Sequence, residues 1–171
     1  KVEEELEKEV RRALEESKRL LDRLTEHSKR VLDELRELLE RVERDVRRVL
    51  EELKRERDDE KATRIIEEVR KRLKDVVDRI RELVERNKRE LDKAVKDSTR
   101  LVEEIKELLR EKLEDKDVVD RLEKELKKVN DEARKRIEEL LRESDRVLEE
   151  VKKKMRELER ELKKVLKEVR D

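Results

Sequence analysis

The residues of this 171-residue chain that could perform chemistry are few, and they centre on its only histidine, His27. A catalytic histidine needs a nucleophile within reach and a group that orients its ring. Ser144 could act as the nucleophile, and Asn87 could orient the ring. Such a site also needs a pocket and an oxyanion hole, whereas the helical pattern described below puts all three residues inside a packed rod. We therefore predict no catalytic residue.

Metal and cofactor sites are excluded by the residue types that the chain lacks. It contains no Cys, Gly, Pro, Phe, Tyr or Trp, so thiolate ligands, glycine-rich phosphate loops and aromatic stacking platforms cannot be built. A single histidine cannot supply the several imidazoles of a zinc or iron site. The Glu-x-x-His motif of di-iron bundles would need Glu at the position that Leu24 occupies. We predict no metal ion and no cofactor.

The charge pattern argues against nucleic-acid and membrane partners. The chain carries 53 Lys and Arg and 53 Asp and Glu, so its formal net charge is zero. Nucleic-acid binding requires a patch of one sign, whereas both signs alternate along this chain, and the basic run at 152–154 fits a solvated helix face. No uncharged run exceeds two residues, so the sequence predicts neither a transmembrane helix nor a signal peptide.

The elements that would position these residues are three long helices, because apolar residues recur at a helical period along the whole chain. Each of three stripes makes 14 steps over 51 residues, or about 3.64 residues per step, close to the ideal 3.6. Flanking leucines such as Leu32, Leu39, Leu101 and Leu108 widen the stripes into core faces. In the first helix the middle of the stripe is Leu20, Leu24, His27, Val31, Leu35, Leu38, Val42, Val46 and Val49.

Two breaks in the stripes set the helix boundaries and divide the chain into near-equal thirds. The first holds 58–60, and the second holds 114–117. Asp is a good N-cap because its carboxylate accepts orphan backbone N–H groups, and Asp117 with Asp120 resembles a capping box. The sequence predicts one domain over 1–171, with helices at about 1–57, 60–114 and 117–171. One unbroken helix is the alternative, but the apolar phase does not continue across the breaks.

Short loops make neighbouring helices antiparallel, so the fold class is all-α: an up-down-up three-helix bundle, coiled-coil-like, with nearly straight helices. Reading the middle stripe backwards stacks the three stripes into fifteen layers that run from Val2 at one end to Val169 at the other. All five polar interruptions of the stripes then fall into two layers. The first layer holds His27, Asn87 and Ser144, and the second holds Ser17 and Ser98 beside Ala133.

We interpret both layers as structural. A buried polar group must be hydrogen-bonded or it destabilises the fold by about 1–3 kcal/mol, and His, Asn and Ser offer donors and acceptors that can satisfy one another. Such layers would exclude slipped helix registers. His27 turned outward into solvent is the alternative. Thr25, Ser28, Thr99 and Asn130 flank the core, where they could join the hydrogen bonds or face water.

On these residues the chain resembles computationally designed, parametrically generated three-helix bundles with buried hydrogen-bond networks. The resemblance rests on the equal thirds, the balanced charges, the Leu/Val/Ile stripes and the polar layer around His27. It implies a stable, rigid, monomeric scaffold with no natural function and no partner, and it carries over no functional residue. The Gly-free turns depart from common design practice. Spectrin-like repeats share the topology but have a core Trp, and single charged helices lack the apolar stripe.

Two functions remain open at this point. The first is a structural scaffold that stays monomeric. The alternative is a helical interaction module that forms an oligomer or leaves a groove for a partner helix.

Overall fold

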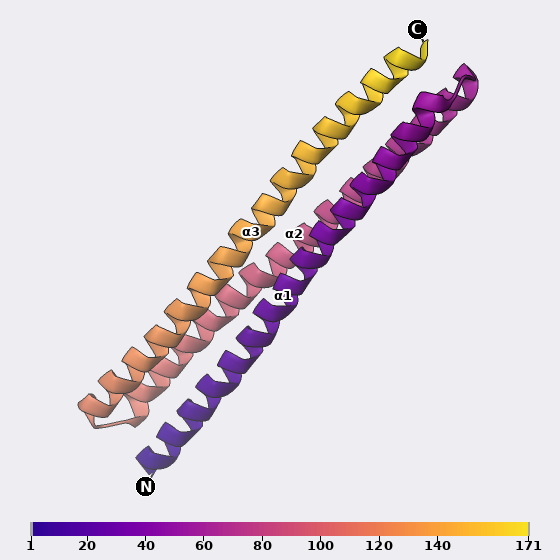
Figure 1. Cartoon of the computed structure of the whole chain (residues 1–171). Helices are drawn as coiled ribbons and strands as arrows, with labels where there is room; N and C mark the ends of the chain where they lie inside the picture. Colours follow the sequence, from indigo (N-terminus) through magenta and orange to yellow (C-terminus); the bar gives the residue numbers. More distant parts are fainter. Residues whose placement is uncertain (1, 171) are drawn as a thin grey trace. The chain divides into compact units, whose positions relative to one another are not determined.

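The chain folds into three long helices joined by two short connections, as a computed structural model shows (Figure 1). The structure describes the backbone of residues 2–170 and the side chains of 3–168. The helices are α1 (Val2–Arg55), α2 (Asp59–Lys112) and α3 (Lys116–Arg170), and no strand occurs within the described backbone. The prediction of an all-α, antiparallel up-down-up three-helix bundle is confirmed, with each described helix end within two residues of its predicted place.

Aspartates cap the two helices that follow a connection, and no glycine is needed. Asp58 accepts from the backbone N–H of Glu60 through Oδ1 (3.1 Å) and from that of Ala62 through its carbonyl (2.9 Å). Asp115 caps α3 in the same way, through Asp117 N–H at 3.0 Å. The predicted capping box at Asp117 was therefore placed two residues too late. No described residue has a positive φ, which explains why these turns do without Gly.

The tertiary contacts divide the chain into two compact units. The first unit comprises Lys1–Arg30 and Asn87–Arg142, and the second comprises Val31–Arg86 and Glu143–Asp171. Each unit contains a segment of all three helices. The predicted single domain over 1–171 stays a prediction.

Each unit encloses its own apolar cluster, fed by all three helices. Leu53, Leu158 and Leu162 are fully enclosed in the second unit, and Leu109, Leu122 and Leu126 are fully enclosed in the first. Burying one such side chain contributes about 1.5–3 kcal/mol. The two clusters therefore supply the cohesion that the charged surface cannot.

Over part of α1 the buried line runs one residue later than the predicted stripe, whereas the stripe residues Leu6, Val10, Leu35, Val46 and Leu53 are buried as predicted. Leu32, Leu39 and Leu50 are buried, whereas their predicted neighbours Val31, Leu38 and Val49 are half-buried. In α3, Val147 is likewise buried in place of Leu148. The apolar residues come in adjacent pairs, so both lines are hydrophobic and the period alone could not choose between them. The end-layer residues Val2 and Val169 lie outside the described side chains.

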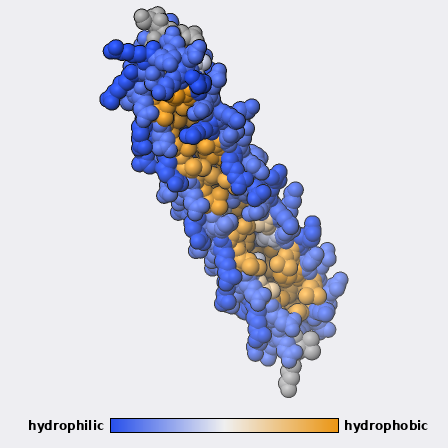
Figure 2. Space-filling model, turned by 90° about the vertical axis from the view of Figure 1, so that its right-hand side faces the viewer, coloured by the Kyte–Doolittle hydropathy of each residue, from blue (hydrophilic) through white to orange (hydrophobic). Residues whose placement is uncertain are grey.

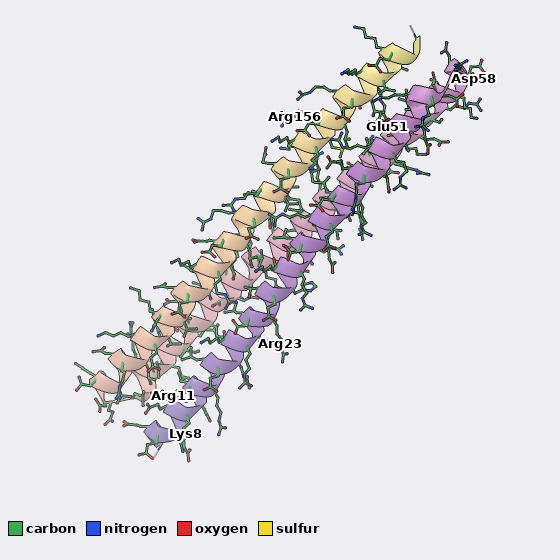
Figure 3. The ribbon with its side chains drawn as sticks, viewed as in Figure 1. Lys8, Arg11, Arg23, Glu51, Asp58 and Arg156 are labelled. Atoms are coloured by element: carbon green, nitrogen blue, oxygen red, sulfur yellow. The ribbon has the colours of Figure 1, made fainter. Side chains whose placement is uncertain are left out.

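Charged side chains cover the outside of the helices. Figure 3 shows Lys8, Arg23 and Arg156 pointing away from the ribbon, and all three are exposed. Over the residues that the structure describes, none of the helices has an apolar stretch that could cross a bilayer.

Candidate functional site

The central predicted layer is only partly correct, because His27 is exposed. Asn87 and Ser144 are buried as predicted, at 4% and 0% exposure. In the first unit, Asn87 Nδ2 donates a 2.8 Å hydrogen bond to Ser28 Oγ, and Ser28 is itself fully buried. Ser28 therefore takes the position that the sequence assigned to His27. The Ser28 hydroxyl oxygen accepts a hydrogen bond from one of the two N–H groups of the Asn87 amide.

The second predicted layer, Ser17 and Ser98 beside Ala133, is only partly formed, because Ser98 bonds to a residue outside it. Ser98 and Ser17 are both half-buried, and Ala133 is buried. Ser98 Oγ donates to Asn130 Oδ1 at 3.1 Å, so α2 bonds to α3 at this level. Asn130 was predicted only as a flanking residue. Ser98 is thus in the interhelical polar contacts as predicted, but its hydrogen bond goes to Asn130.

Two threonines of the first unit each receive an arginine from α3. Thr25 Oγ1 donates to its own helix at Asp22 O (3.0 Å) and accepts from Arg136 Nη2 (2.8 Å). The same guanidinium also pairs with the Asp22 carboxylate through Nη1. The Thr25 hydroxyl and the Arg136 guanidinium therefore each form two hydrogen bonds, and together they hold α1 against α3 at a fixed level.

The second threonine repeats this arrangement between α2 and α3. Thr99 Oγ1 donates to Val95 O (2.9 Å) and accepts from Arg134 Nη2 (2.7 Å). In both cases the hydroxyl hydrogen goes to the threonine's own helix and its oxygen accepts from the neighbouring helix. Sequence reasoning missed both arginines. The only signal was their position two residues apart on α3, among many other arginines.

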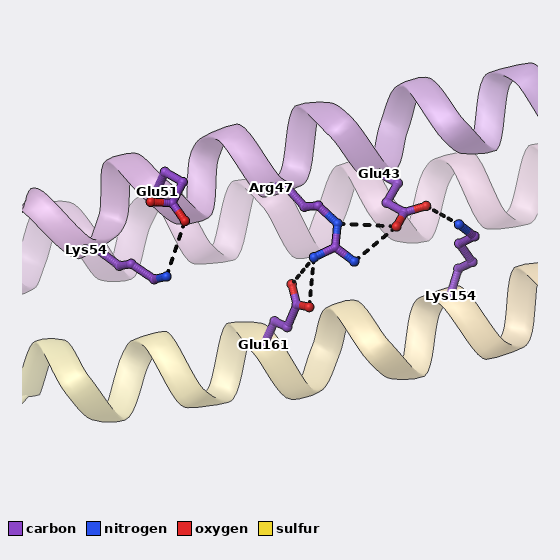
Figure 4. Close-up of polar contacts among 6 residues, drawn as sticks. All are labelled: Glu43, Arg47, Glu51, Lys54, Lys154 and Glu161. Carbon is purple, nitrogen blue, oxygen red and sulfur yellow. Dashed lines mark hydrogen bonds and ion pairs between the residues drawn. The ribbon is translucent and has the colours of Figure 1, made fainter.

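In the second unit the polar contacts are ionic. Arg47 of α1 donates through Nη1 to both carboxylate oxygens of Glu161 on α3, at 2.9 and 3.0 Å (Figure 4). Its Nη2 and Nε bond to Glu43, whose other oxygen accepts from Lys154. The hydrogen bond from Lys154, opposed by burial, lowers the pKa of Glu43 below its ordinary value. The same bond raises the pKa of Lys154.

Opposite charges therefore alternate along this contact and neutralise one another. The hydrogen bonds that Arg47 donates to Glu161 and Glu43 raise the pKa of Arg47. The groove beside them, about 310 Å³, is lined mostly by the charged ends of both helices. Surface ion pairs of this kind contribute about 0–1 kcal/mol each. They fix the level of α1 against α3.

Helix α3 takes part in the ion pairs that join one helix to another. Among the described side chains, seven ion pairs between helices join α3 either to α1 or to α2. The α1 pairs are Arg11–Glu125, Arg36–Glu150, Arg47–Glu161, Asp22–Arg136 and Glu43–Lys154, and the α2 pairs are Arg70–Glu159 and Arg110–Glu123.

No described group of three or more His, Asp or Glu side chains is placed to hold a metal ion. What the polar residues do is hydrogen-bond one helix to another. In the first unit these hydrogen bonds join all three pairs of helices. Ser28–Asn87 joins α1 to α2, Thr25–Arg136 joins α1 to α3, and Ser98–Asn130 joins α2 to α3.

Comparisons with known proteins add the following. No family model matches the chain, and no curated protein matches it either. Among solved structures, the chain is similar to a computationally designed three-helix bundle, at a TM-score of 0.42 and 16% sequence identity. The match covers 97% of this chain and 85% of that one.

Proposed function

We propose that this protein is a structural scaffold, a stable, rigid helical bundle with no enzymatic activity and no cofactor. The observation that carries the proposal is the use made of the polar groups that could do chemistry. Every buried side-chain nitrogen or oxygen in the described part of the chain has a hydrogen-bond partner. Asn87 bonds to Ser28, and Ser98 bonds to Asn130. Groups that are satisfied in this way hold helices together and are not free to bind or activate a substrate.

The composition supports an origin in computational design. The charges balance at 53 of each sign, and the chain contains no Gly, Pro, Cys or aromatic residue. Strong helix formers fill the surface, and Leu, Val and Ile fill the core, as design practice recommends. On this proposal the chain has no natural biochemical function. Because both signs interleave on every helix, nucleic acids and membranes are not its partners.

The scaffold proposal is tested by measuring the molar mass and the thermal melt of the protein at low concentration. Size exclusion with light scattering at micromolar concentration should give the mass of one chain, 21.1 kDa. The far-UV circular dichroism melt should be cooperative, with a midpoint independent of protein concentration, because one chain supplies all three helices. A midpoint that rises with concentration over a range in which light scattering gives the mass of one chain would contradict this, and the scaffold proposal would fail.

One observation favours a second candidate, a helical interaction module. Leu20 is 64% exposed, Leu101 is 39% exposed and Leu108 is 37% exposed. Large apolar side chains on an otherwise charged surface mark contact sites. This function adds to the scaffold, because the folded monomer would be the unit that associates.

A further inference from the structure

The side of the second unit where α1 meets α2 is open and apolar. A groove of about 260 Å³ lies between the two helices, with valines on both walls. Of these, Val42, Val49 and Val76 remain half-buried in the folded chain. The upper part of Figure 2 shows apolar side chains lying open between hydrophilic margins. The apolar residues that line the groove are Val42, Val46, Val49, Val69, Leu73 and Val76.

The margins of this groove carry charges that match across it. Because the connection at 56–58 is short, residues equally far from it on α1 and α2 lie at one level. Along α1 the margin alternates in sign, and α2 shows the opposite sign at each level. Of the charged residues, Asp45, Arg72 and Asp75 line the groove itself. Counted from the connection, the four level pairs are Arg41 with Asp75, Asp45 with Arg72, Arg48 with Glu68, and Glu52 with Arg64.

None of these eight side chains forms an ion pair or hydrogen bond within the chain, over the residues described, and all eight are exposed. The margins that face α3, in contrast, are closed by pairs such as Arg47–Glu161 and Arg70–Glu159, both at 2.9 Å. The groove between α1 and α2 therefore combines solvated charges that are unpaired within the chain with the half-buried valines Val42, Val49 and Val76.

We propose that a second copy of this chain docks on the α1/α2 groove of the second unit, about a two-fold axis that runs along the helices. This inference rests on the interaction function proposed above and names its partner, and the valines of the second unit carry it, because Leu20, Leu101 and Leu108 all belong to the first unit. Such an axis places α1 of each copy against the antiparallel α2 of the other at the same level. Asp45 then faces Arg72 of the second copy, and Arg72 faces Asp45 of the second copy. The valines of both grooves become the centre of the contact, and zero net charge leaves no overall repulsion to oppose it.

Paired charge reversals test the proposal. In Asp45→Arg, each copy would present an arginine against Arg72 of its partner, twice by symmetry, and Arg72→Asp would create the same conflict with the opposite sign. Each variant alone should self-associate roughly tenfold more weakly than the parent. In a mixed dimer of the two variants, the introduced arginine faces the introduced aspartate, and the unchanged Arg72 of one copy faces the unchanged Asp45 of the other. Opposite charges are thereby restored at both contacts, so a heterodimer should form at parental affinity.

Light scattering after size exclusion measures the result, from micromolar to millimolar chain concentration. The parent mass should rise from 21.1 kDa toward twice that value, the single variants should lag behind, and their equimolar mixture should match the parent. A matched control mixes Glu138→Arg with Arg160→Asp, two exposed α3 positions whose reversals change the net charge equally. This mixture should gain nothing over its components.

Three outcomes would overturn the proposal: a parent that stays at 21.1 kDa, a variant mixture that behaves as the sum of its parts, or a control mixture that associates equally well. Circular dichroism of each sample keeps the two proposals apart. Retained helicity with no association rejects the docking surface alone, whereas lost helicity would count against the scaffold itself.

Discussion

The hydrogen bond between Ser28 and Asn87 is the sharpest test of the claim that buried polar residues stabilise this fold. It is the one described side-chain bond that joins α1 to α2, and both partners are enclosed, at 0% and 4% exposure. We predict that Ser28→Ala lowers the free energy of unfolding by about 1–3 kcal/mol, because the buried amide of Asn87 loses its acceptor. Asn87→Leu should cost less, because a lone Ser hydroxyl can turn to a carbonyl of its own helix.

The double variant Ser28→Ala/Asn87→Leu removes both polar groups and leaves no unsatisfied donor. Replacing both partners of a buried hydrogen bond by apolar groups is often nearly neutral, so the double variant should be more stable than Ser28→Ala alone. The coupling free energy from the double-mutant cycle should be about 1–2 kcal/mol. For a chain of this length, each kcal/mol corresponds to about 2–4 °C in the melting midpoint.

Guanidinium unfolding of the four proteins gives the cycle directly, provided that the slope with denaturant is unchanged. The half-buried pair of Ser98 and Asn130, at 3.1 Å, is the matched control. Its cycle of Ser98→Ala with Asn130→Leu should give a smaller coupling, since water can replace either partner. A coupling near zero at Ser28 and Asn87, or one no larger than at the control pair, would refute the reasoning.

The helices themselves could be predicted from the sequence because one signal dominates. Apolar residues repeat at the helical period with only five polar interruptions, and the phase breaks only at the two connections. The absence of Gly and Pro leaves nothing inside a helix to end it early. For this reason the helix ends fall within two residues of their predicted places, and antiparallel packing follows from the short connections.

The register around each helix could not be predicted in the same way. His27 and Ser28 are neighbours, as are Val31 and Leu32, so two adjacent lines along α1 both read as a core stripe. Which line is buried depends on side chains of the other helices, through packing that the pattern of one helix does not contain. The one-residue difference moved His27 to the surface and put Ser28 beside Asn87.

Arg134 and Arg136 show a second limit to what the sequence pattern could predict. Both are exposed arginines, and nothing in their spacing separates them from the other basic residues on α3. Their role depends on Thr99 and Thr25, whose hydroxyls already donate to their own helices and so present only an oxygen to the neighbour. A threonine beside the core is a visible signal, but its partner is chosen by the level at which another helix passes. That level is a property of the folded bundle.

The remaining predictions concern acid, the histidine and the core. The pKa of Glu43 is lowered in the folded state by its hydrogen bond from Lys154, so its contribution is present above the ordinary glutamate pKa of about 4.3 and is lost as the pH falls through the lower folded value. Glu43→Gln should therefore lose less stability than the parent between pH 7 and acid, as measured by guanidinium unfolding at each pH; an equal loss would contradict this. His27→Gln should change the free energy of unfolding by less than about 0.5 kcal/mol, since the ring is exposed, and a larger loss would restore a buried role. Leu53→Ala should cost about 2–5 kcal/mol, because this side chain is fully enclosed and its removal leaves a cavity. Leu20→Ala, at 64% exposure, should change the stability of the monomer by less than about 0.5 kcal/mol. Equal costs at the two leucines would mean that Leu20 is covered in solution, by a contact that the single chain does not supply.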